Sequence, residues 1–274
     1  MPLEELPAFC AFAHEFAFES YGVRVKIETT DAELLEEAEL KARKALVDNL
    51  RRVENSDAEH LFGIASDAEG TLHLYKNGEE YSSDTDRHRF FKFFDSILRI
   101  EVAEHAVGWV FIHAGVVALN GRAILIPGDS FSGKTTLVQE LVRAGAEYYS
   151  DEYAVLDSAG LVHPFPRLLS VRYMDNGSIG ERDVEIDSIG GISGSEPIPV
   201  GMVLLTRFVD GASWEPETLS VGQGILETIP HTIPRQSNAV HALKVLNTAF
   251  TDAIILRSSR GDAAELAKTL LSFF

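Results

Sequence analysis

The sequence predicts an α/β fold, with a larger domain built on a mixed sheet over residues 86–274 and a smaller N-terminal α/β domain over residues 1–85. Three observations predict it. Stretches typical of strands are interleaved with stretches typical of helices along the whole chain. A glycine-rich motif at residues 128–135 stands between a buried strand and a helix. The 274 residues, 45% of them hydrophobic, can bury one substantial core or two modest ones.

The N-terminal domain begins with a strand and a charged helix. Residues 22–28 alternate apolar and charged side chains, as a half-buried strand does. Residues 31–53 predict a helix, because Asp31 can cap its start and acidic and basic residues lie one helical turn apart on an exposed face. We interpret these charged side chains as a solvent-exposed helix face and not as a functional site.

A hairpin and a long helix follow. Asn77-Gly78 is the strongest short hairpin signal in the sequence, and strands flank it at residues 72–76 and 79–81. From residue 86 to residue 107 apolar side chains recur at a spacing that suits a helix. This helix carries an aromatic cluster, which we expect to lie in the core. The alternative is that the cluster forms a docking surface. The cluster consists of Phe90, Phe91, Phe93 and Phe94.

Two adjacent strands lead to the glycine-rich motif. Residues 109–119 are rich in β-branched side chains, Asn120-Gly121 makes a turn, and residues 122–127 form a buried strand. A helix over residues 135–143 follows the motif. The remaining elements are strands at 154–156, 161–163 and 200–208 and helices at 239–251 and 262–273.

The motif matches the phosphate-binding pattern G-x-x-x-x-G-K-[ST] at every fixed position. Its glycines let the loop curl so that backbone N–H groups point inward, and the N-terminus of the next helix adds partial positive charge. Lys134 is expected to reach the β- and γ-phosphates of a nucleotide, and the Thr135 hydroxyl to ligate the Mg²⁺ that bridges them. Thr136 caps or packs beside them. The loop consists of Gly128, Asp129, Ser130, Phe131, Ser132, Gly133, Lys134 and Thr135.

Composition excludes several classes of partner. The net charge of −18 repels nucleic acid and anionic lipid, so neither is an expected partner, whereas a cationic protein or peptide remains possible. The single cysteine, Cys10, forms no intrachain disulfide and suits a reducing compartment. The apolar start, Leu6 to Phe18, is interrupted by His14 and Glu15, unlike a signal peptide, and no run reaches membrane-spanning length. A cytoplasmic location is therefore expected.

Phosphoryl transfer also requires a carboxylate close to the loop. No apolar strand that ends in aspartate follows the loop cleanly. The first acidic pair is Asp151-Glu152, a short distance after the loop helix. The alternative is a turn whose acidic side chains merely face solvent.

Four features of the larger domain share their order and spacing with a known family. They are His113 ahead of the loop, the loop itself after a short strand, Arg143-Ala144-Gly145 at the end of its helix, and Ser150-Asp151-Glu152. The chain thereby resembles the HPr kinase/phosphorylase family and its relatives among bacterial HPr-kinase-like serine kinases, which share a nucleotide-binding core with phosphoenolpyruvate carboxykinases. The resemblance covers residues 109–274 and implies a phosphate-loop kinase core on a mixed sheet.

The resemblance also implies roles for single residues. Asp151 corresponds to the family's general base, which accepts the proton of the acceptor hydroxyl. Glu152 stands where the family usually has a second aspartate and would help to hold Mg²⁺ or water. His113 corresponds to the active-site histidine near the phosphates, the alternative being a core histidine.

A second family signature matches in part at residues 184–192. Glu185 would be the glutamate on the metal side. Asp187 stands where the family signature has arginine, which argues against the family's HPr recognition and phosphorylase activity. The alternative is a Gly-rich surface loop.

Positive charge beyond Lys134 and Mg²⁺ is needed to stabilise the transferred phosphoryl group. Arg235, in a proline-marked loop ahead of a helix, is the favoured candidate, and Arg207 ends an apolar strand. Arg167 and Arg172 are further candidates. Each of the four could equally form a surface ion pair.

Together these features predict an ATP- and Mg²⁺-dependent kinase that phosphorylates a serine hydroxyl on a protein or peptide. The acceptor would be an HPr-like carrier or the precursor of a ribosomally made peptide. One alternative is a nucleotide-binding regulatory module with little turnover, and another is a small-molecule kinase. The resemblance also suggests a homo-oligomer. The N-terminal domain is expected to select the protein or peptide partner.

Overall fold

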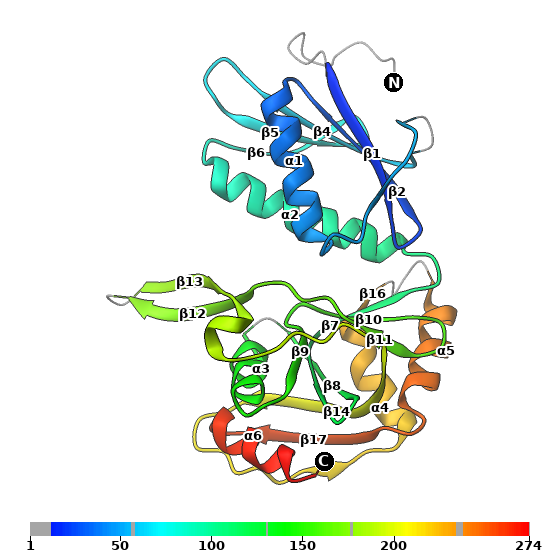
Figure 1. Ribbon diagram of the computed structural model, residues 1–274, viewed down its shortest axis with the longest axis vertical. Coiled ribbons are helices and arrows are strands. Elements are labelled where there is room, and N and C mark those ends of the chain that lie inside the picture. The colour runs from blue at the N-terminus through cyan, green and yellow to red at the C-terminus, as the bar shows by residue number, and fades with distance from the viewer. Residues whose placement is uncertain (1–11, 56–57, 130, 176–177, 234–237, 274) are drawn as a thin grey trace. The chain divides into compact units, whose positions relative to one another are not determined.

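The computed structural model describes residues 12–55, 58–129, 131–175, 178–233 and 238–273. The chain forms two compact units, Met1–Val107 and Gly108–Phe274 (Figure 1). The sequence placed the boundary after residue 85, and the structure places it after Val107. The reason is that the long helix α2 (Arg87–His105) packs against elements of the first unit and so belongs to it.

The first unit is built on a six-stranded mixed sheet in the order β3-β1-β2-β4-β5-β6. Strands β2 and β4 are parallel, and the other neighbours are antiparallel. Helices α1 (Ala32–Ala45) and α2 pack against each other and against this sheet (Figure 1). The strands are β1 (His14–Ser20), β2 (Val23–Thr29), β3 (Arg51–Arg52), β4 (His60–Ser66), β5 (Leu72–Lys76) and β6 (Glu79–Asp84).

Local chemistry explains where α1 begins and ends. An Asp31 carboxylate oxygen accepts a hydrogen bond from the Leu34 N–H at 2.9 Å, as predicted for its N-cap. The prediction that this helix continues to residue 53 was wrong. The backbones of Val47 and Asp48 take positive φ angles of 48° and 58°, which end the helix before the chain enters β3.

The hairpin and the aromatic helix follow the sequence prediction. Asn77 and Gly78, with φ angles of 51° and 85°, form the turn between β5 and β6. Of the aromatic cluster on α2, three side chains are fully buried and Phe93 is exposed. The core interpretation is therefore confirmed for Phe90, Phe91 and Phe94.

The second unit is built on a nine-stranded mixed sheet with the main order β11-β10-β7-β8-β14-β17-β15. Strands β8, β14 and β17 are parallel to one another, and β9 and β16 pair with β7. The strands are β7 (Val110–Leu119), β8 (Arg122–Pro127), β9 (Glu147–Ser150), β10 (Tyr153–Leu156), β11 (Leu161–His163), β14 (Ile198–Phe208), β15 (Glu217–Thr218), β16 (Thr232–Ile233) and β17 (Ile254–Arg260).

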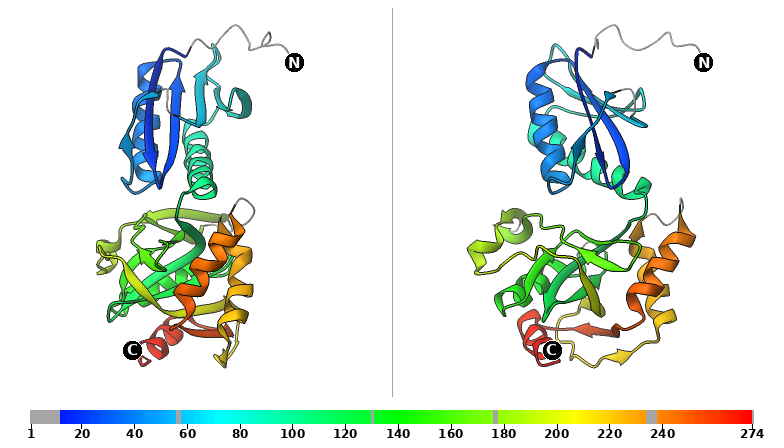
Figure 2. Two further views of the ribbon diagram at one scale, coloured as in Figure 1. Left: turned by 90° about the vertical axis from the view of Figure 1, so that its right-hand side faces the viewer. Right: turned by 45° about the vertical axis from the view of Figure 1, so that its right-hand side comes forward.

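Helices cover both faces of this sheet (Figure 2). Helices α3 (Lys134–Arg143) and α6 (Ala263–Leu271) share one hydrophobic core with the sheet, and α4 (Val221–Thr228) and α5 (Ala239–Phe250) share the other. Strands β12 (Leu169–Asp175) and β13 (Ser178–Val184) form a separate hairpin. Short 3₁₀ helices lie at η2 (Ile186–Ile189) and η3 (Ile229–His231). Among the described residues, no helix combines the length and apolarity needed to cross a membrane.

The three parallel strands determine where a site can form. Their carboxyl ends, Pro127, Phe208 and Arg260, meet at one edge of the sheet. The glycine-rich loop leaves β8 at this edge and enters α3. Open α/β sheets bind ligands at such carboxyl ends, so we expect a ligand-binding site at this edge.

Candidate functional site

The glycine-rich loop connects β8 to α3 and is fixed at both ends. The Gly128 N–H donates to the His113 carbonyl on β7 at 3.3 Å, and the Ser132 N–H donates to the Asp129 carbonyl at 3.3 Å. Gly133 begins α3 with a φ of 89°, a conformation that favours glycine. Thr135 and Thr136 stand in the first turn of α3, the former half-buried and the latter exposed. Ser130 lies outside the described residues.

Lys134 folds back across the loop. Its side chain is buried, and its Nζ donates to the carbonyl oxygens of Gly128 at 2.7 Å and Asp129 at 2.8 Å. A buried ammonium needs acceptors, and here the loop itself supplies them. The loop, the helix N-terminus and a buried cation therefore concentrate positive potential at one point.

The turn between β9 and β10 holds the acidic pair. Ser150 is buried, and its Oγ accepts hydrogen bonds from the N–H groups of Glu152 at 3.1 Å and Tyr153 at 3.0 Å. This hydroxyl closes the turn locally and leaves the Asp151 and Glu152 side chains half-buried on the turn. The Glu152 carbonyl accepts from the Ala114 N–H at 3.2 Å, which ties the turn to β7.

Strand β7 brings the loop and the acidic turn together. Ala114 pairs with Pro127 on one side of β7, and His113 pairs with Tyr153 on the other. An added Cβ on Gly115 would stand 3.9 Å from Asp151 Oδ1, so this carboxylate lies against the strand. The loop and the Asp151 turn thus flank the same short stretch of β7.

Two histidines near Lys134 are held neutral. Burial, and then the charge of Lys134, lower the pKa of His113 on β7, although Glu152 and Asp129 partly oppose this. His231, at the end of η3, lies with Nδ1 3.3 Å from Asp129 Oδ1. Burial also lowers the pKa of His231, with Asp129 raising and Lys134 lowering it. Both imidazoles are therefore mainly uncharged at neutral pH.

Arg260, which was absent from the candidates in the sequence, lies directly against the loop. It ends β17 and is 2% exposed. Its Nη2 donates to the Gly133 carbonyl at 2.7 Å and its Nη1 to the Gly261 carbonyl at 3.0 Å. Burial lowers the pKa of its guanidinium, and Asp262 opposes this only in part. The sequence signal that could have indicated it is the apolar run Ile254–Leu256, the first half of strand β17, which was not predicted and which ends at this arginine.

The arginines selected from the sequence lie in different places. Arg207, exposed near the end of β14, lines a cleft beside the loop. Arg167 lies over β9, where its carbonyl accepts from the Tyr148 hydroxyl at 2.7 Å. Arg172 is in β12, and Arg235 lies outside the described residues.

Glu185 lies at the exposed start of η2. The neighbouring Ile186 packs into the core on the α3 face of the sheet. Glu185 is not among the described residues that line the clefts at the loop. Its assignment to a metal remains a prediction.

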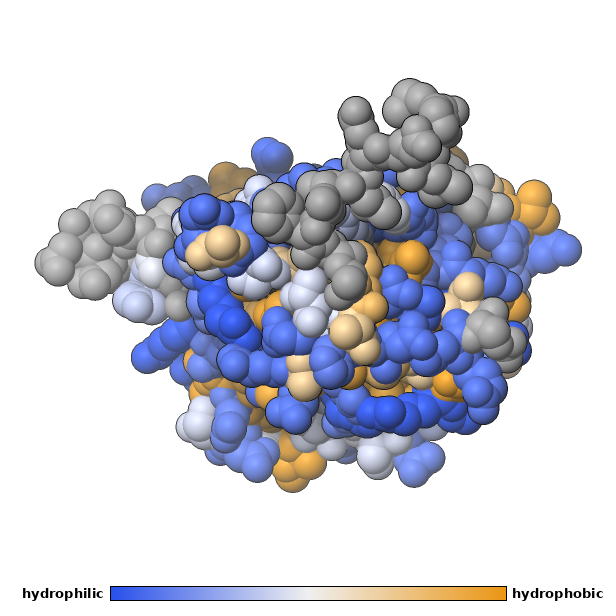
Figure 3. Space-filling view, turned by 90° about the horizontal axis from the view of Figure 1, so that it is seen from above, coloured by the Kyte–Doolittle hydropathy of each residue, from blue (hydrophilic) through white to orange (hydrophobic). Residues whose placement is uncertain are grey.

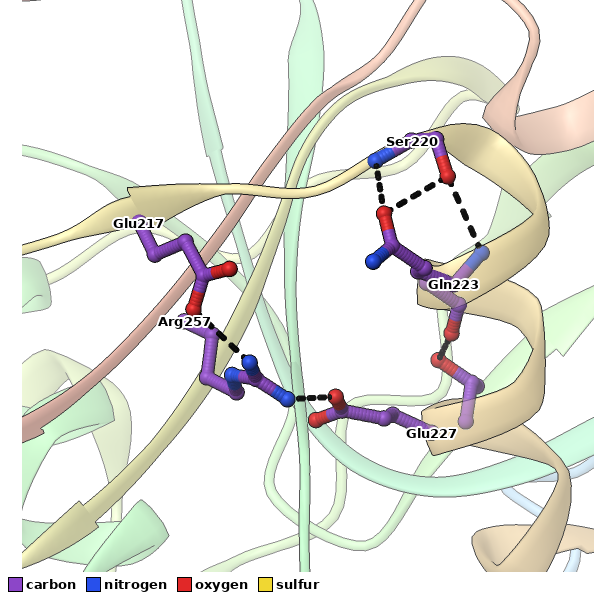
Figure 4. A network of polar contacts seen from close by, with 7 residues as sticks. Glu217, Ser220, Gln223, Glu227 and Arg257 are labelled. Carbon is purple, nitrogen blue, oxygen red and sulfur yellow. Dashed lines mark hydrogen bonds and ion pairs between the residues drawn. The ribbon is translucent and has the colours of Figure 1, made fainter.

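An acidic cleft of about 610 Å³ opens beside the loop on the α4 side. The loop contributes Gly128 and Asp129 to its lining, and β17 contributes Arg257. Arg257 is held between Glu217, at 2.7 Å, and Glu227 on α4 (Figure 4). A capping box fixes the start of α4, since the Gln223 side chain accepts from the backbone N–H of Ser220 at 3.0 Å (Figure 4). The lining of this cleft is thus rich in carboxylates, which include Asp129, Glu217 and Glu227.

No protein-family model matches the chain, and no curated protein matches it. Among solved structures, the chain is similar to the Hpr(Ser) kinase/phosphatase from Coxiella burnetii, with 16% sequence identity and a TM-score of 0.31. The match covers 60% of this chain and 94% of that chain. So low a TM-score establishes no activity for this chain.

Proposed function

We propose that this chain is an ATP- and Mg²⁺-dependent kinase that transfers a phosphoryl group to a serine hydroxyl of a protein or peptide. The observation that carries this proposal is the buried ammonium of Lys134 inside a strand–loop–helix with the full G-x-x-x-x-G-K-[ST] pattern. The Asp151 carboxylate, on the turn that flanks the same stretch of β7, supports a transfer reaction rather than binding alone.

In this proposal the loop exchanges internal contacts for contacts with phosphate. The carbonyls of Gly128 and Asp129 release the Lys134 ammonium, which then binds the more strongly charged β- and γ-phosphate oxygens. Within the described part of the chain, the buried Ser132 Oγ has no hydrogen-bond partner, and a phosphate oxygen would supply one. The N–H groups at the start of α3 add further donors.

The chemistry of the donors near the loop fits Mg²⁺, which prefers oxygen ligands. The Thr135 hydroxyl and the Glu152 carboxylate are both partly accessible and would hold it. When bound, Mg²⁺ neutralises the charge that develops on the phosphates. Glu185, by its place at η2, is the less favoured of the predicted metal ligands.

Asp151 takes the role of general base. Its carboxylate accepts the proton of the serine hydroxyl as the serine oxygen bonds to the γ-phosphorus and the bond from that phosphorus to the ADP oxygen breaks. Neutral His113 would position groups by hydrogen bonding, and the positive charge of Arg260 lies at the same loop. The acidic cleft of about 610 Å³ leaves room for an acceptor segment.

Transfer from radiolabelled ATP tests this function. The intact chain, Mg²⁺ and ATP labelled at the γ-phosphate are incubated with candidate serine-containing proteins and peptides. We expect label on a serine of one acceptor. Tight ATP binding without transfer to any acceptor would contradict the proposal and favour a regulatory module, whereas label on a small hydroxy compound would indicate a small-molecule kinase.

A further inference from the structure

A second cleft, of about 350 Å³, opens at the loop on the face of the sheet that α3 and α6 cover. The loop contributes Phe131 and Gly133 to it, α3 contributes Thr136, and the ends of β14 and β17 contribute Phe208 and Arg260. Its volume lies near the lower end of the range for small-molecule sites, about 300–1,000 Å³. The role proposed above for Lys134 leaves this cleft unused.

Two aromatic side chains are exposed at this cleft. Phe131 is 76% exposed and Phe208 is 52% exposed, although phenylalanine is ordinarily among the most buried residues. Phe131 also has a φ of 69°, in the left-handed region that bulky residues rarely adopt. Such an outlier in a loop is a feature of ligand-binding segments. The Phe208 N–H donates to the Ser132 carbonyl at 3.0 Å, which ties this aromatic residue to the loop.

Arg260 adds an independent observation at the same cleft. Its side chain is buried, two of its nitrogens donate to backbone carbonyls, and its Nε has no hydrogen-bond partner among the described residues. Its guanidinium carbon lies 5.8 Å from the centre of the Phe208 ring. A buried, incompletely satisfied cation next to an exposed ring suits a ligand that has both an aromatic and an acceptor part.

We propose that this cleft binds the nucleoside part of the nucleotide, with the base stacked against Phe208 and Phe131. Nε of Arg260 would donate a hydrogen bond to an oxygen of the ribose or the α-phosphate. The inference rests on the proposed function. When the phosphates bind at Lys134, the rest of the nucleotide extends past Gly133 and Thr136, and both of these residues line this cleft. Stacking on an aromatic ring is available to every base because each has a π-face.

Two ligands separate base binding from phosphate binding. Calorimetric titrations with ADP and with inorganic tripolyphosphate, each with Mg²⁺, are compared for the unaltered chain, Phe208→Ala, Phe208→Tyr and Phe131→Ala. Leu226→Ala, which truncates a side chain 70% exposed on α4, is the surface control. Phe208→Ala should weaken ADP binding roughly 5- to 100-fold and leave tripolyphosphate binding unchanged. Phe208→Tyr and Leu226→Ala should bind both ligands normally, and Phe131→Ala should weaken ADP alone.

The outcomes distinguish this inference from the proposed function. If Phe208→Ala and Phe131→Ala both bind ADP as tightly as the unaltered chain does, the proposed base site is overturned. The proposed phosphate site at Lys134 would not be affected by that result. Equal loss of both ligands in Phe208→Ala would overturn it as well, because the ring would then support the loop rather than a base. Failure of the unaltered chain to bind either ligand would overturn the proposed function itself.

Discussion

Lys134 places a buried positive charge inside the glycine-rich loop. Its ammonium is buried with the Gly128 and Asp129 carbonyls as hydrogen-bond acceptors, and these hydrogen bonds also hold the curl of the loop. The same charge helps to keep His113 and His231 neutral. One lysine therefore holds the curl of the loop, carries positive charge at the proposed phosphate site and adds to the burial that lowers the pKa of both histidines.

Removal of this charge should abolish tight nucleotide binding. We expect Lys134→Met to weaken binding of Mg-ADP by about 10- to 100-fold, since charge-assisted hydrogen bonds to phosphate contribute about 1.5–3 kcal/mol. Lys244→Met, at an exposed position of α5, is the matched control and should bind normally. Calorimetric titration measures both. Unchanged affinity in Lys134→Met would exclude the loop as the phosphate site.

The half-buried His113 predicts a dependence of stability on pH. Because burial and Lys134 lower the pKa of His113, the unfolded chain binds its proton more readily than the folded chain does. The folded state is therefore favoured above the ordinary histidine pKa and loses stability as the pH falls below it. The loss of unfolding free energy between pH 7 and pH 5 should be smaller in His113→Gln than in the unaltered chain. His231 contributes with the same sign to both proteins.

Urea unfolding followed by tryptophan fluorescence measures this difference. The chain has two tryptophans, Trp109 and Trp214, and both lie in the unit that contains His113. Equal losses of unfolding free energy in the two proteins on acidification would contradict the shifted pKa.

At the scale of elements, the site depends on how closely α3 lies against β7. An added Cβ on Gly115 would stand 2.5 Å from Cγ2 of Val138, a residue of α3, so the absence of a side chain at Gly115 sets this spacing. The preceding β7 residues hold the loop, through the His113 carbonyl, and the Asp151 turn, through the Ala114 N–H. Packing between these two elements therefore determines the position of Lys134 relative to Asp151.

A methyl group at Gly115 should push α3 away from β7. We expect Gly115→Ala to lower the free energy of unfolding by about 1–3 kcal/mol, the usual effect of overpacking, and to weaken ADP binding. Val138→Ala removes the opposing methyl groups, so the double variant should recover part of the loss. A double-mutant cycle in urea tests this. Strictly additive effects would show that the two side chains do not limit the spacing.

The sequence predicted several elements that have strong local signals. It missed helix α4, despite the capping box at Ser220, and strand β17, which depends on distant contacts. Strands β7 and β8, helix α3 and the Asn77-Gly78 hairpin follow from periodicity and turn chemistry. Strand β17 was missed because its second half, Arg257 to Arg260, is polar, and it is a strand because β14 pairs along its length. The contact of Arg260 with Gly133 could not be read from the sequence, since it needs three parallel strands to end at one edge.

At the scale of the whole molecule, the chain consists of two units with separate stabilising networks. The view in Figure 3 shows a face dominated by hydrophilic side chains, in keeping with a net charge of −18. Within the first unit, Glu101 on α2 is buried and bound by His60 at 2.8 Å and Lys76 at 2.5 Å. Burial alone would raise the pKa of Glu101, but these partners outweigh it and lower the pKa to about 2.

Lys76→Met should destabilise the first unit in a pH-dependent way. The Glu101 carboxylate stabilises the folded state fully above its ordinary pKa of 4.5, and this contribution is lost as the pH falls from 4.5 toward 2. Loss of the ammonium should cost about 1–3 kcal/mol at pH 7, and the gap from the unaltered chain should narrow below pH 4.5.

Urea unfolding followed by far-ultraviolet circular dichroism detects both units, and the part of the transition that tryptophan fluorescence does not follow is assigned to this unit, which has no tryptophan. Glu36→Gln, which neutralises an exposed carboxylate of α1, is the control and should change little at either pH. A gap for Lys76→Met that stays constant with pH would show that Lys76 acts by packing and not through the Glu101 charge.

Intact-mass spectrometry of candidate acceptors, after incubation with Mg-ATP and either the unaltered chain or Asp151→Asn, tests whether this chain is a kinase. We predict the mass gain of one phosphoryl group, located on a serine, with the unaltered chain, and its loss with Asp151→Asn although that variant still binds ATP. No gain on any acceptor, with ATP binding confirmed, or an equal gain with Asp151→Asn, would contradict the assignment of this site to phosphoryl transfer with Asp151 as its base.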